Sequence, residues 1–263
     1  MAEPDLAERL IVVAFGGGLD STVALVEMRE RDIVPDATLF ADTGGEKPET
    51  YAHVGRMNTW CIRNGFPEIV TVKKRGKHGT LENDCLNNKM LPSIAYGRNK
   101  SCSIKWKHQP QDRWVNNWEP AKAAWKRGEK VVKVIGYDFS EHHRAVYDPS
   151  NPKYEFWYPL IEWRIDREEA KRILHRAGIC PPPKSSCFFC PSTTKSEILR
   201  LGARNPDLLN RAIEMERNAD LKTVRGLGRR FSWEKFVESD RAQQRLFPEA
   251  DELPCGTCFD GGE

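Results

Sequence analysis

The sequence of 263 residues has no hydrophobic run long enough to cross a membrane. Its longest early run, Leu10 to Phe15, falls far short of the roughly 18 apolar residues that a spanning helix needs. Its first residues, Met1 to Asp5, are acidic and lack the basic start of a secretory signal. With 39% hydrophobic and 30% charged residues, the composition excludes disordered, collagen-like and membrane-spanning chains. We therefore expect a soluble, cytoplasmic protein without a membrane partner.

An excess of charge of one sign is also missing. Lys and Arg number 41 and Asp and Glu 38, so the formal net charge is +3. The charge is nevertheless unevenly distributed: residues 98–130 hold nine basic and three acidic residues, and residues 73–77 add a second basic cluster. Local basic clusters favour a polyanionic ligand such as a nucleotide or a nucleic acid. A charged face that contacts only solvent explains them equally well.

The N-terminal half alternates buried strands with helical patterns. Leu10 to Phe15 is an apolar, β-branched run, three glycines end it, and an apolar-periodic stretch follows from Asp20 to Met28. The alternation predicts further strands at 37–41, 69–72 and 131–135, and helices at 48–64 and 166–177. Strands that alternate with helices form parallel sheets with right-handed crossovers. The pattern therefore predicts an α/β fold, a Rossmann-like parallel sheet with helices on both faces.

Two regions depart from this alternation. Residues 73–128 carry an irregular pattern with four tryptophans, which we interpret as an excursion over the sheet edge. The run Pro181 to Pro183 stops the preceding helix, and helical patterns follow at 195–202, 206–217 and 233–240. We therefore predict a nucleotide-binding domain over residues 1–180 and a helical, cysteine-containing C-terminal region over residues 181–263.

The first glycine loop is the strongest candidate binding site. In open parallel sheets, ligands bind beyond the carboxyl ends of the strands, where this loop precedes a helix. Glycines allow phosphate oxygens close to the backbone, and a helix N-terminus favours negative charge. The loop matches neither the Walker pattern nor the dinucleotide fingerprint. We predict a phosphate-binding cradle formed by Gly16, Gly17, Gly18, Ser21 and Thr22. The alternative is a tight turn that binds no ligand.

This loop and five further segments carry a family resemblance. Phe15 to Ser21 is similar to the Ser-Gly-Gly-x-Asp-Ser loop of the PP-loop ATP pyrophosphatase (adenine nucleotide alpha hydrolase-like) superfamily. More narrowly, the chain resembles the phosphoadenosine phosphosulfate (PAPS) reductase family. The matching segments keep the family's order and run from about residue 10 to 191: Asp42–Tyr51, Cys102–Lys105 with Pro110, Gly136–Arg144, Tyr158–Trp163 and Cys187–Cys190.

The resemblance implies an adenine-nucleotide site with specific roles. Lys105 and Arg144 would clamp phosphates and offset the charge that develops during cleavage at the α-phosphorus. Asp20 would orient the loop or help hold a metal ion, and Asp42 would reach the ribose or that ion. If the nucleotide is ATP, Mg²⁺ would accompany it.

Two departures argue against sulfonucleotide reduction. Gly16 stands where the pyrophosphatases carry Ser, and Cys255 to Cys258 replaces the reductases' C-terminal Glu-Cys-Gly-Leu/Ile-His, whose Cys attacks sulfur. The intact Gly-Gly-x-Asp-Ser core of the loop favours ATP over PAPS. We therefore expect an enzyme that cleaves ATP or transfers its adenylyl group, linked to sulfur transfer, with a sulfur donor or thiol reductant protein as partner. Two alternatives are a thiol-dependent reductase of PAPS or its dephosphorylated relative, and a non-catalytic module that binds a nucleotide or nucleic acid.

Eight cysteines are many for a chain without a secretion signal, where a disulfide scaffold is not expected. Two Cys-x-x-Cys pairs have the form of a four-thiolate metal site. The resemblance adds Cys102 and a [4Fe–4S] cluster, with Zn²⁺ as the other candidate. A redox or sulfur-carrying thiol pair and reduced structural cysteines are the alternatives. The candidate ligands are Cys102, Cys187, Cys190, Cys255 and Cys258.

Four tryptophans interleave with basic residues between positions 105 and 125. Aromatic rings among cations can bind single-stranded nucleic acid. Trp114, Trp118 and Trp125, however, are spaced as one helical stripe, which more often packs onto a core. We expect packing to be their main role.

Overall fold

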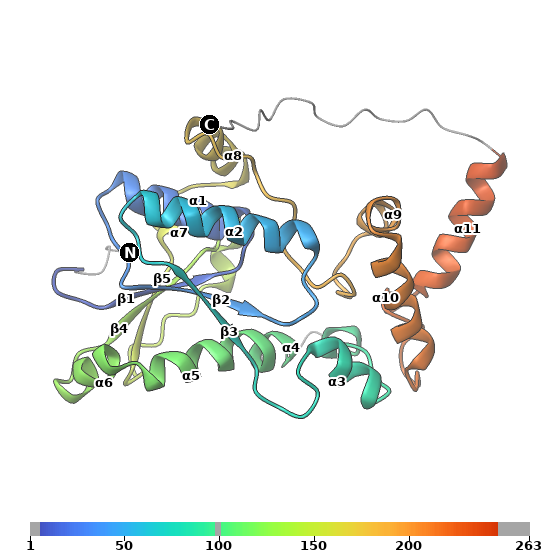
Figure 1. Cartoon of the computed structure of the whole chain (residues 1–263), viewed down its shortest axis with the longest axis horizontal. Helices are drawn as coiled ribbons and strands as arrows, with labels where there is room; N and C mark the ends of the chain where they lie inside the picture. The colour runs from blue at the N-terminus through green and yellow to red at the C-terminus, as the bar shows by residue number, and fades with distance from the viewer. Residues whose placement is uncertain (1–5, 98–100, 247–263) are drawn as a thin grey trace. The chain divides into compact units, whose positions relative to one another are not determined.

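The computed structural model describes residues 6–97 and 101–246 and contains one five-stranded parallel sheet. The strand order β3-β2-β1-β4-β5 confirms the predicted Rossmann-like sheet (Figure 1). The sequence pattern did not identify β5. The strands are β1 (Ile11–Phe15), β2 (Ala37–Asp42), β3 (Ile69–Lys73), β4 (Val131–Ile135) and β5 (Tyr154–Trp157).

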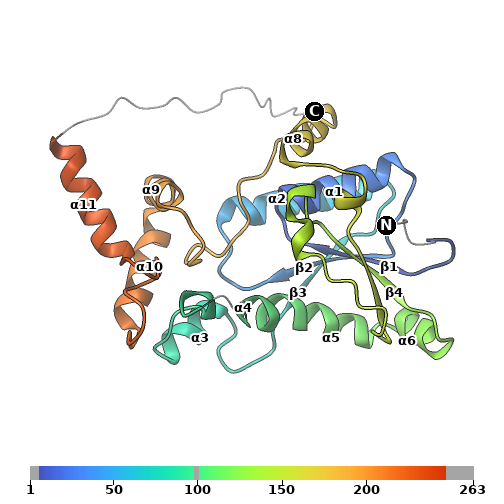
Figure 2. The same ribbon diagram turned by 180° about the vertical axis from the view of Figure 1, so that it is seen from behind.

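Alternating residues of β1 face the two sides of the sheet. Phe15 joins a core cluster with residues of α1 (Leu19–Glu30) and α2 (Pro48–Arg63), which cover one face. Val12 joins a second cluster with α5 (Gln109–Asn117) and α6 (Glu119–Lys126), which cover the other face. Figures 1 and 2 show these helices on opposite sides of the strands. A sheet covered on both faces explains why β1 and β2 are apolar along most of their length.

Helix α1 is buried almost all round. Its other side packs against α7 (Pro159–Glu162) and α8 (Arg167–Arg176). Asp166 caps α8 by accepting hydrogen bonds from the backbone N–H groups of Glu168 and Glu169. The glycine loop is therefore attached to a helix that is held on two sides, which makes its position rigid.

The segment with the irregular sequence pattern is largely helical over residues 101–126. Its elements are short, polar and interrupted by prolines, so no continuous helical period is visible in the sequence. Trp118 lies between two helices rather than within one. The three tryptophans of the supposed stripe still pack against the cluster around Val12, which confirms their packing role. The elements before α5 are α3 (Leu81–Asn87), η1 (Ser93–Ala95), α4 (Ser101–Ser103) and the π-helical η2 (Ile104–His108).

The chain divides into two compact units, one of residues 1–84 and 100–187 and one of residues 85–99 and 188–263. The second unit contains α9 (Lys195–Arg204), α10 (Pro206–Asn218) and α11 (Trp233–Leu246), which confirm the three predicted C-terminal helices. No helix among the described residues is long and apolar enough to span a membrane.

Candidate functional site

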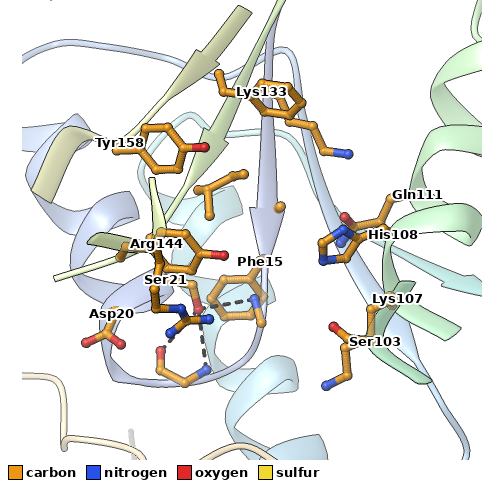
Figure 3. Close-up of a pocket in the computed structure, with 18 of the residues that line it drawn as sticks. Phe15, Asp20, Ser21, Ser103, Lys107, His108, Gln111, Lys133, Arg144 and Tyr158 are labelled. Carbon is orange, nitrogen blue, oxygen red and sulfur yellow. Dashed lines mark hydrogen bonds between the residues drawn. The ribbon is translucent and has the colours of Figure 1, made fainter. Parts of the chain in front are cut away.

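A cavity of about 490 Å³ lies where the strand order reverses, at the carboxyl ends of β1 and β4. We call it the β1–β4 cavity. Its lining comes from the glycine loop, the start of α1, the turn after β4, β5 and the segment from α4 to α5. Figure 3 shows two walls, with Asp20, Ser21 and Arg144 on one side and Lys107 and His108 on the other. Parallel sheets place their ligands at such a reversal point.

The glycine loop has little room for side chains. Gly17 has φ +68°, and a Cβ there would lie 3.1 Å from Val54 Cγ2. A Cβ on Gly136, directly after β4, would lie 2.9 Å from the backbone nitrogen of Ser21. Only glycine allows this conformation and this close approach, so the two strand ends and the first turn of α1 form one tight surface.

Hydroxyl groups tie the loop to the helix that follows it. The N–H groups of Gly16 and Gly18 donate to Ser21 Oγ over 3.2 and 3.4 Å. Thr22 Oγ1 donates to the Gly18 carbonyl over 2.8 Å and lies 2.8 Å from His53 Nε2. Ser21 lines the cavity, whereas Thr22 is fully buried and does not. Of the predicted cradle, the cavity is therefore lined by Gly16, Gly18 and Ser21.

Asp20 lies in the first turn of α1 and lines the cavity. Its Oδ1 is buried, and no described residue forms a hydrogen bond with it. Burial, together with the charges of Asp138 and Glu141, raises the pKa of Asp20 from 3.8 to about 6. A buried carboxylate oxygen without a partner is a candidate ligand for a cation or a hydrogen-bond donor.

Two lysines face the cavity from the opposite wall and the sheet. Lys107 of η2 pairs with Glu46 over 2.8 Å, and Lys133 of β4 pairs with Asp112 over 2.6 Å. Each partner carboxylate lies outside the cavity lining, so it positions an ammonium group that the cavity presents. Desolvation, together with the positive charges of Lys133 and Lys107, lowers the pKa of the neighbouring His108 below the usual 6.5, which favours the neutral imidazole.

Arg144, at the end of η3 (Phe139–Arg144), also lines the cavity. Its guanidinium lies 4.2 Å from the centroid of the Tyr137 ring and pairs with Glu141. Tyr137 stacks on Tyr158 with 5.6 Å between the ring centroids, so this wall joins a cation to two aromatic rings. Arg144 is thus the predicted basic residue that the structure brings to the glycine loop.

Two other predicted residues lie outside the cavity lining. Lys105 is exposed. Asp42 accepts hydrogen bonds from Tyr51 Oη and the Gly44 N–H, each over 2.7 Å, and pairs with Lys73 over 3.1 Å. The proposed nucleotide roles of both residues stay predictions.

Sequence reasoning missed Lys107 and Lys133. Lys133 is a basic residue within an otherwise apolar strand. Its relative exposure is 6%, and a buried lysine needs a partner of opposite charge. That isolated charge was the available signal for Lys133. Lys107 and Lys105 lie two positions apart in the π-helical η2, and only Lys107 lines the cavity. The sequence carries no signal for a π-helical turn, so it could not distinguish the two lysines.

The cysteines are only partly described. Cys187 is buried, and its Sγ lies 3.2 Å from Thr43 Oγ1 and 4.0 Å from Glu46 Oε1. Cys102 and Cys190 are half-buried. Cys255 and Cys258 lie outside the described residues. Within the described part of the chain, no three His, Cys, Asp or Glu residues form a group that could hold a metal ion, so the metal site stays a prediction.

Comparisons with known proteins add little. No family model and no curated protein matches the chain. Among solved structures, the chain is similar to U34-tRNA thiolase NcsA from Methanococcus maripaludis, determined with its [4Fe–4S] cluster. The two are 16% identical, the match covers 96% of this chain and 76% of that one, and the TM-score is 0.45. A likeness this loose carries no argument about activity, and the described residues themselves must support any function.

Proposed function

We propose that the β1–β4 cavity binds an adenine nucleotide, ATP in preference to PAPS, and that the protein cleaves it or transfers its adenylyl group. The observation that carries this proposal is the meeting, in one cavity, of a glycine loop at a helix N-terminus with Lys107, Lys133 and Arg144. The cavity of about 490 Å³ falls within the usual size of small-molecule sites. This proposal places the chain in the PP-loop superfamily that its sequence resembles.

The polar part of the cavity suits phosphates. The positive end of α1 and three basic side chains favour several negative charges close together. Their carboxylate partners hold these cations before a ligand arrives, so little rearrangement would accompany charge build-up at phosphorus. In the reaction, a nucleophile attacks the α-phosphorus, the bond to the bridging oxygen breaks, and pyrophosphate leaves with the electron pair.

The aromatic part suits a base. Phe40, Phe156, Tyr137 and Tyr158 all line the cavity, and Tyr137 already stacks on Tyr158. A flat purine gains most from such rings when it lies parallel to one of them. The Gln111 side chain also lines the cavity, and its Nε2 donates to the Leu39 carbonyl over 3.1 Å, which orients the amide.

Asp20 fits the Mg²⁺ that accompanies ATP. Mg²⁺ typically binds one or two carboxylates together with the substrate phosphates and several waters. Asp20 supplies one carboxylate with an unpartnered buried oxygen, beside Asp138 and Glu141, whose charges raise its pKa. The ion would offset phosphate charge, and Asp20 would position it. For an iron–sulfur cluster the described residues offer no comparable group.

A link to sulfur transfer rests on the cysteines alone. Cys187 lies beside Glu46, the same carboxylate that pairs with Lys107. This contact supports a thiol near the cavity wall, and the sulfur donor or thiol reductant protein of the earlier prediction remains the partner class to be tested.

The first experiment incubates the full chain with Mg²⁺ and ATP and measures pyrophosphate, with PAPS and sulfite release as the second arm. We expect pyrophosphate from ATP and no sulfite from PAPS. Sulfite release would instead identify a reductase, and nucleotide binding without either product would identify a non-catalytic module.

The matched variants are Lys107→Met, combined with Glu46→Gln so that no buried charge is orphaned, and Lys126→Met on α6, an exposed lysine outside the cavity lining. Loss of one charge-assisted contact costs about 1.5–3 kcal/mol, so the first should weaken nucleotide binding by about tenfold or more. The exposed Lys126 should tolerate its change within about twofold. Calorimetric titration checks both, and equal losses would contradict the assignment of the cavity.

A further inference from the structure

A second hollow lies on the same unit, beside the edge strand of the sheet. It has a volume of about 930 Å³ and is lined by residues 71–75 of β3 and the segment after it, and by residues of α5 and its C-terminal end. We call it the β3 groove. Among the described strands, β3 pairs only with β2, so its outer edge is not covered by another strand.

The β3 groove is strongly basic. Its charged lining consists of Lys73, Lys74, Arg75 and Arg113, and no acidic residue is among the residues that line it. Lys73 pairs with Asp42, but the other three cations take part in no ion pair within the described part of the chain. Lys74 Nζ lies 4.2 Å from the centroid of the Trp106 ring. Like charges held close together repel one another, and a ligand of opposite charge relieves that repulsion.

Two tryptophans stand among these cations. Trp114 and Trp118 line the groove, with 5.3 Å between their ring centroids and a tilt of 32° between their planes. Both rings are half-buried, since they also pack against the core cluster around Val12. Their packing therefore fixes the rings on one side while part of each ring remains open to the groove.

From this combination we propose that the β3 groove binds single-stranded nucleic acid. Phosphates would contact Arg75 and Arg113, and bases would stack on the Trp114–Trp118 pair. Basic grooves with fixed aromatic rings are the usual means of holding single strands, because every base has a flat face and every linkage a charge. A chain of acidic residues such as polyglutamate would use the cations but has no flat ring to stack on the paired tryptophans.

Helix α5 connects this groove to the β1–β4 cavity. Gln111 on α5 lines the cavity, and Arg113, Trp114 and Asn117 on the same helix line the groove. The inference does not depend on the proposed nucleotide chemistry, because it rests on other residues and is tested by binding alone.

The test measures binding of labelled oligo-rU and oligo-dT to the full chain by anisotropy at several salt concentrations. The variant is Arg75→Glu with Arg113→Glu, two exposed residues. The control is Arg56→Glu with Arg63→Glu, which changes the net charge by the same amount. Both residues are exposed on α2, which covers the opposite face of the sheet. Thermal melts monitored by circular dichroism verify that both variants fold.

We expect the groove variant to lose about tenfold or more in affinity, and the slope of log K against log salt to fall by about 1.4 for two lost phosphate contacts. The control should stay within about threefold, as expected for long-range charge effects alone. Equal losses in both variants, or no loss in either, would overturn the proposal. A higher affinity for oligo-rU than for oligo-dT would support the proposal and indicate that the groove contacts the ribose 2′-hydroxyl.

The stacking part has its own test. Oligonucleotide binding should quench tryptophan fluorescence, and the quench should shrink in Trp114→Phe with Trp118→Phe, which keeps aromatic packing. An abasic oligomer of the same charge should bind more weakly, since stacking is worth about 1–3 kcal/mol per base. If the abasic oligomer or polyglutamate binds as tightly, the groove is a site for acidic chains and the nucleic-acid assignment is wrong.

Discussion

Two carboxylates with buried oxygens, Asp20 in α1 and Glu216 in α10, have opposite surroundings. Glu216 accepts hydrogen bonds from Ser232 Oγ over 2.5 Å and from the N–H groups of Leu227, Trp233 and Glu234 over 2.6 to 3.3 Å. Asp20 has a buried oxygen for which no described residue supplies a donor. A saturated carboxylate holds its own unit together, whereas an unsaturated one beside a cavity is available to a ligand. The comparison separates structural acids from functional ones, and the following predictions test it.

We expect the largest loss of stability from replacing Glu216. Glu216→Leu leaves buried N–H groups of the segment 227–234 without an acceptor, which we expect to cost about 3–5 kcal/mol of unfolding free energy. Urea titration measures the total loss, and hydrogen exchange at the Leu227 and Trp233 amides locates it. Glu214→Gln, an exposed change on the same helix, is the control and should cost less than about 0.5 kcal/mol. Unchanged exchange at those amides would mean that Glu216 does not hold the segment.

Asp42 has an intermediate position, with one hydroxyl, one N–H and one ammonium as partners. Burial raises the pKa of Asp42, but these partners outweigh burial and hold the pKa below its ordinary value of 3.8. Its ionised form therefore stabilises the fold above pH 3.8, and the stabilisation is lost as the pH falls through the folded pKa. We expect Asp42→Asn to cost about 1–2 kcal/mol at pH 7 and progressively less in acid.

Melting temperatures of the wild type and Asp42→Asn between pH 3 and pH 7 check this dependence. Tyr51→Phe removes one of the three partners and serves as the graded control, with a smaller loss of the same sign. A cost that is independent of pH would show that the charge of Asp42 is unimportant.

We expect the smallest change in stability from replacing Asp20, and its sign is opposite to that for Asp42. Its folded pKa of about 6 lies above 3.8, so the folded state binds the proton more tightly than the unfolded state. The resulting stabilisation is complete below pH 3.8 and is lost as the pH rises through 6. Asp20→Asn should therefore leave stability near pH 4 almost unchanged and increase it at pH 8, where the wild type carries the ionised group.

The same variant should lose function. We expect pyrophosphate release from ATP to fall by about tenfold or more, as for a lost charged contact with the ligand. Thermal melts across the pH range and the release assay check the two halves of this prediction. If Asp20→Asn were instead destabilised at pH 8 with full activity, Asp20 would be a structural acid like Glu216, and the comparison would fail.

Much of the fold was predictable because its signals are local. The apolar run ending at Phe15, the glycines after it and the helix that follows are adjacent in sequence, and the structure confirms strand and helix there. The α5–α6 region was not predictable in the same way. Its short helices contain Pro110 and Pro120 and obtain their stability from packing of Val115 and Ala121 on the sheet rather than from a continuous period.

The candidate site likewise has a part that local sequence predicted and a part that only tertiary contacts determine. Local sequence placed the glycine loop and Ser21 at the mouth of a parallel sheet, because the carboxyl end of a strand followed by a capped helix is a chain-local feature. Which cations face that loop depends on contacts between distant segments. Lys133 reaches the cavity from β4 through its pair with Asp112, and Lys107, not Lys105, faces inward because η2 is a π-helical turn held by the Glu46 pair.

The sequence by itself determined the parallel α/β architecture, the loop at Gly16 to Gly18 and the helical C-terminal region, since each follows from patterns within about twenty residues. Tertiary structure alone decided that Asp20 has an orphaned oxygen while Glu216 is saturated, and that basic residues gather in two separate hollows. The physical reason is that hydrogen-bond satisfaction and the electrostatic field at a point depend on which distant groups the fold brings within a few ångströms.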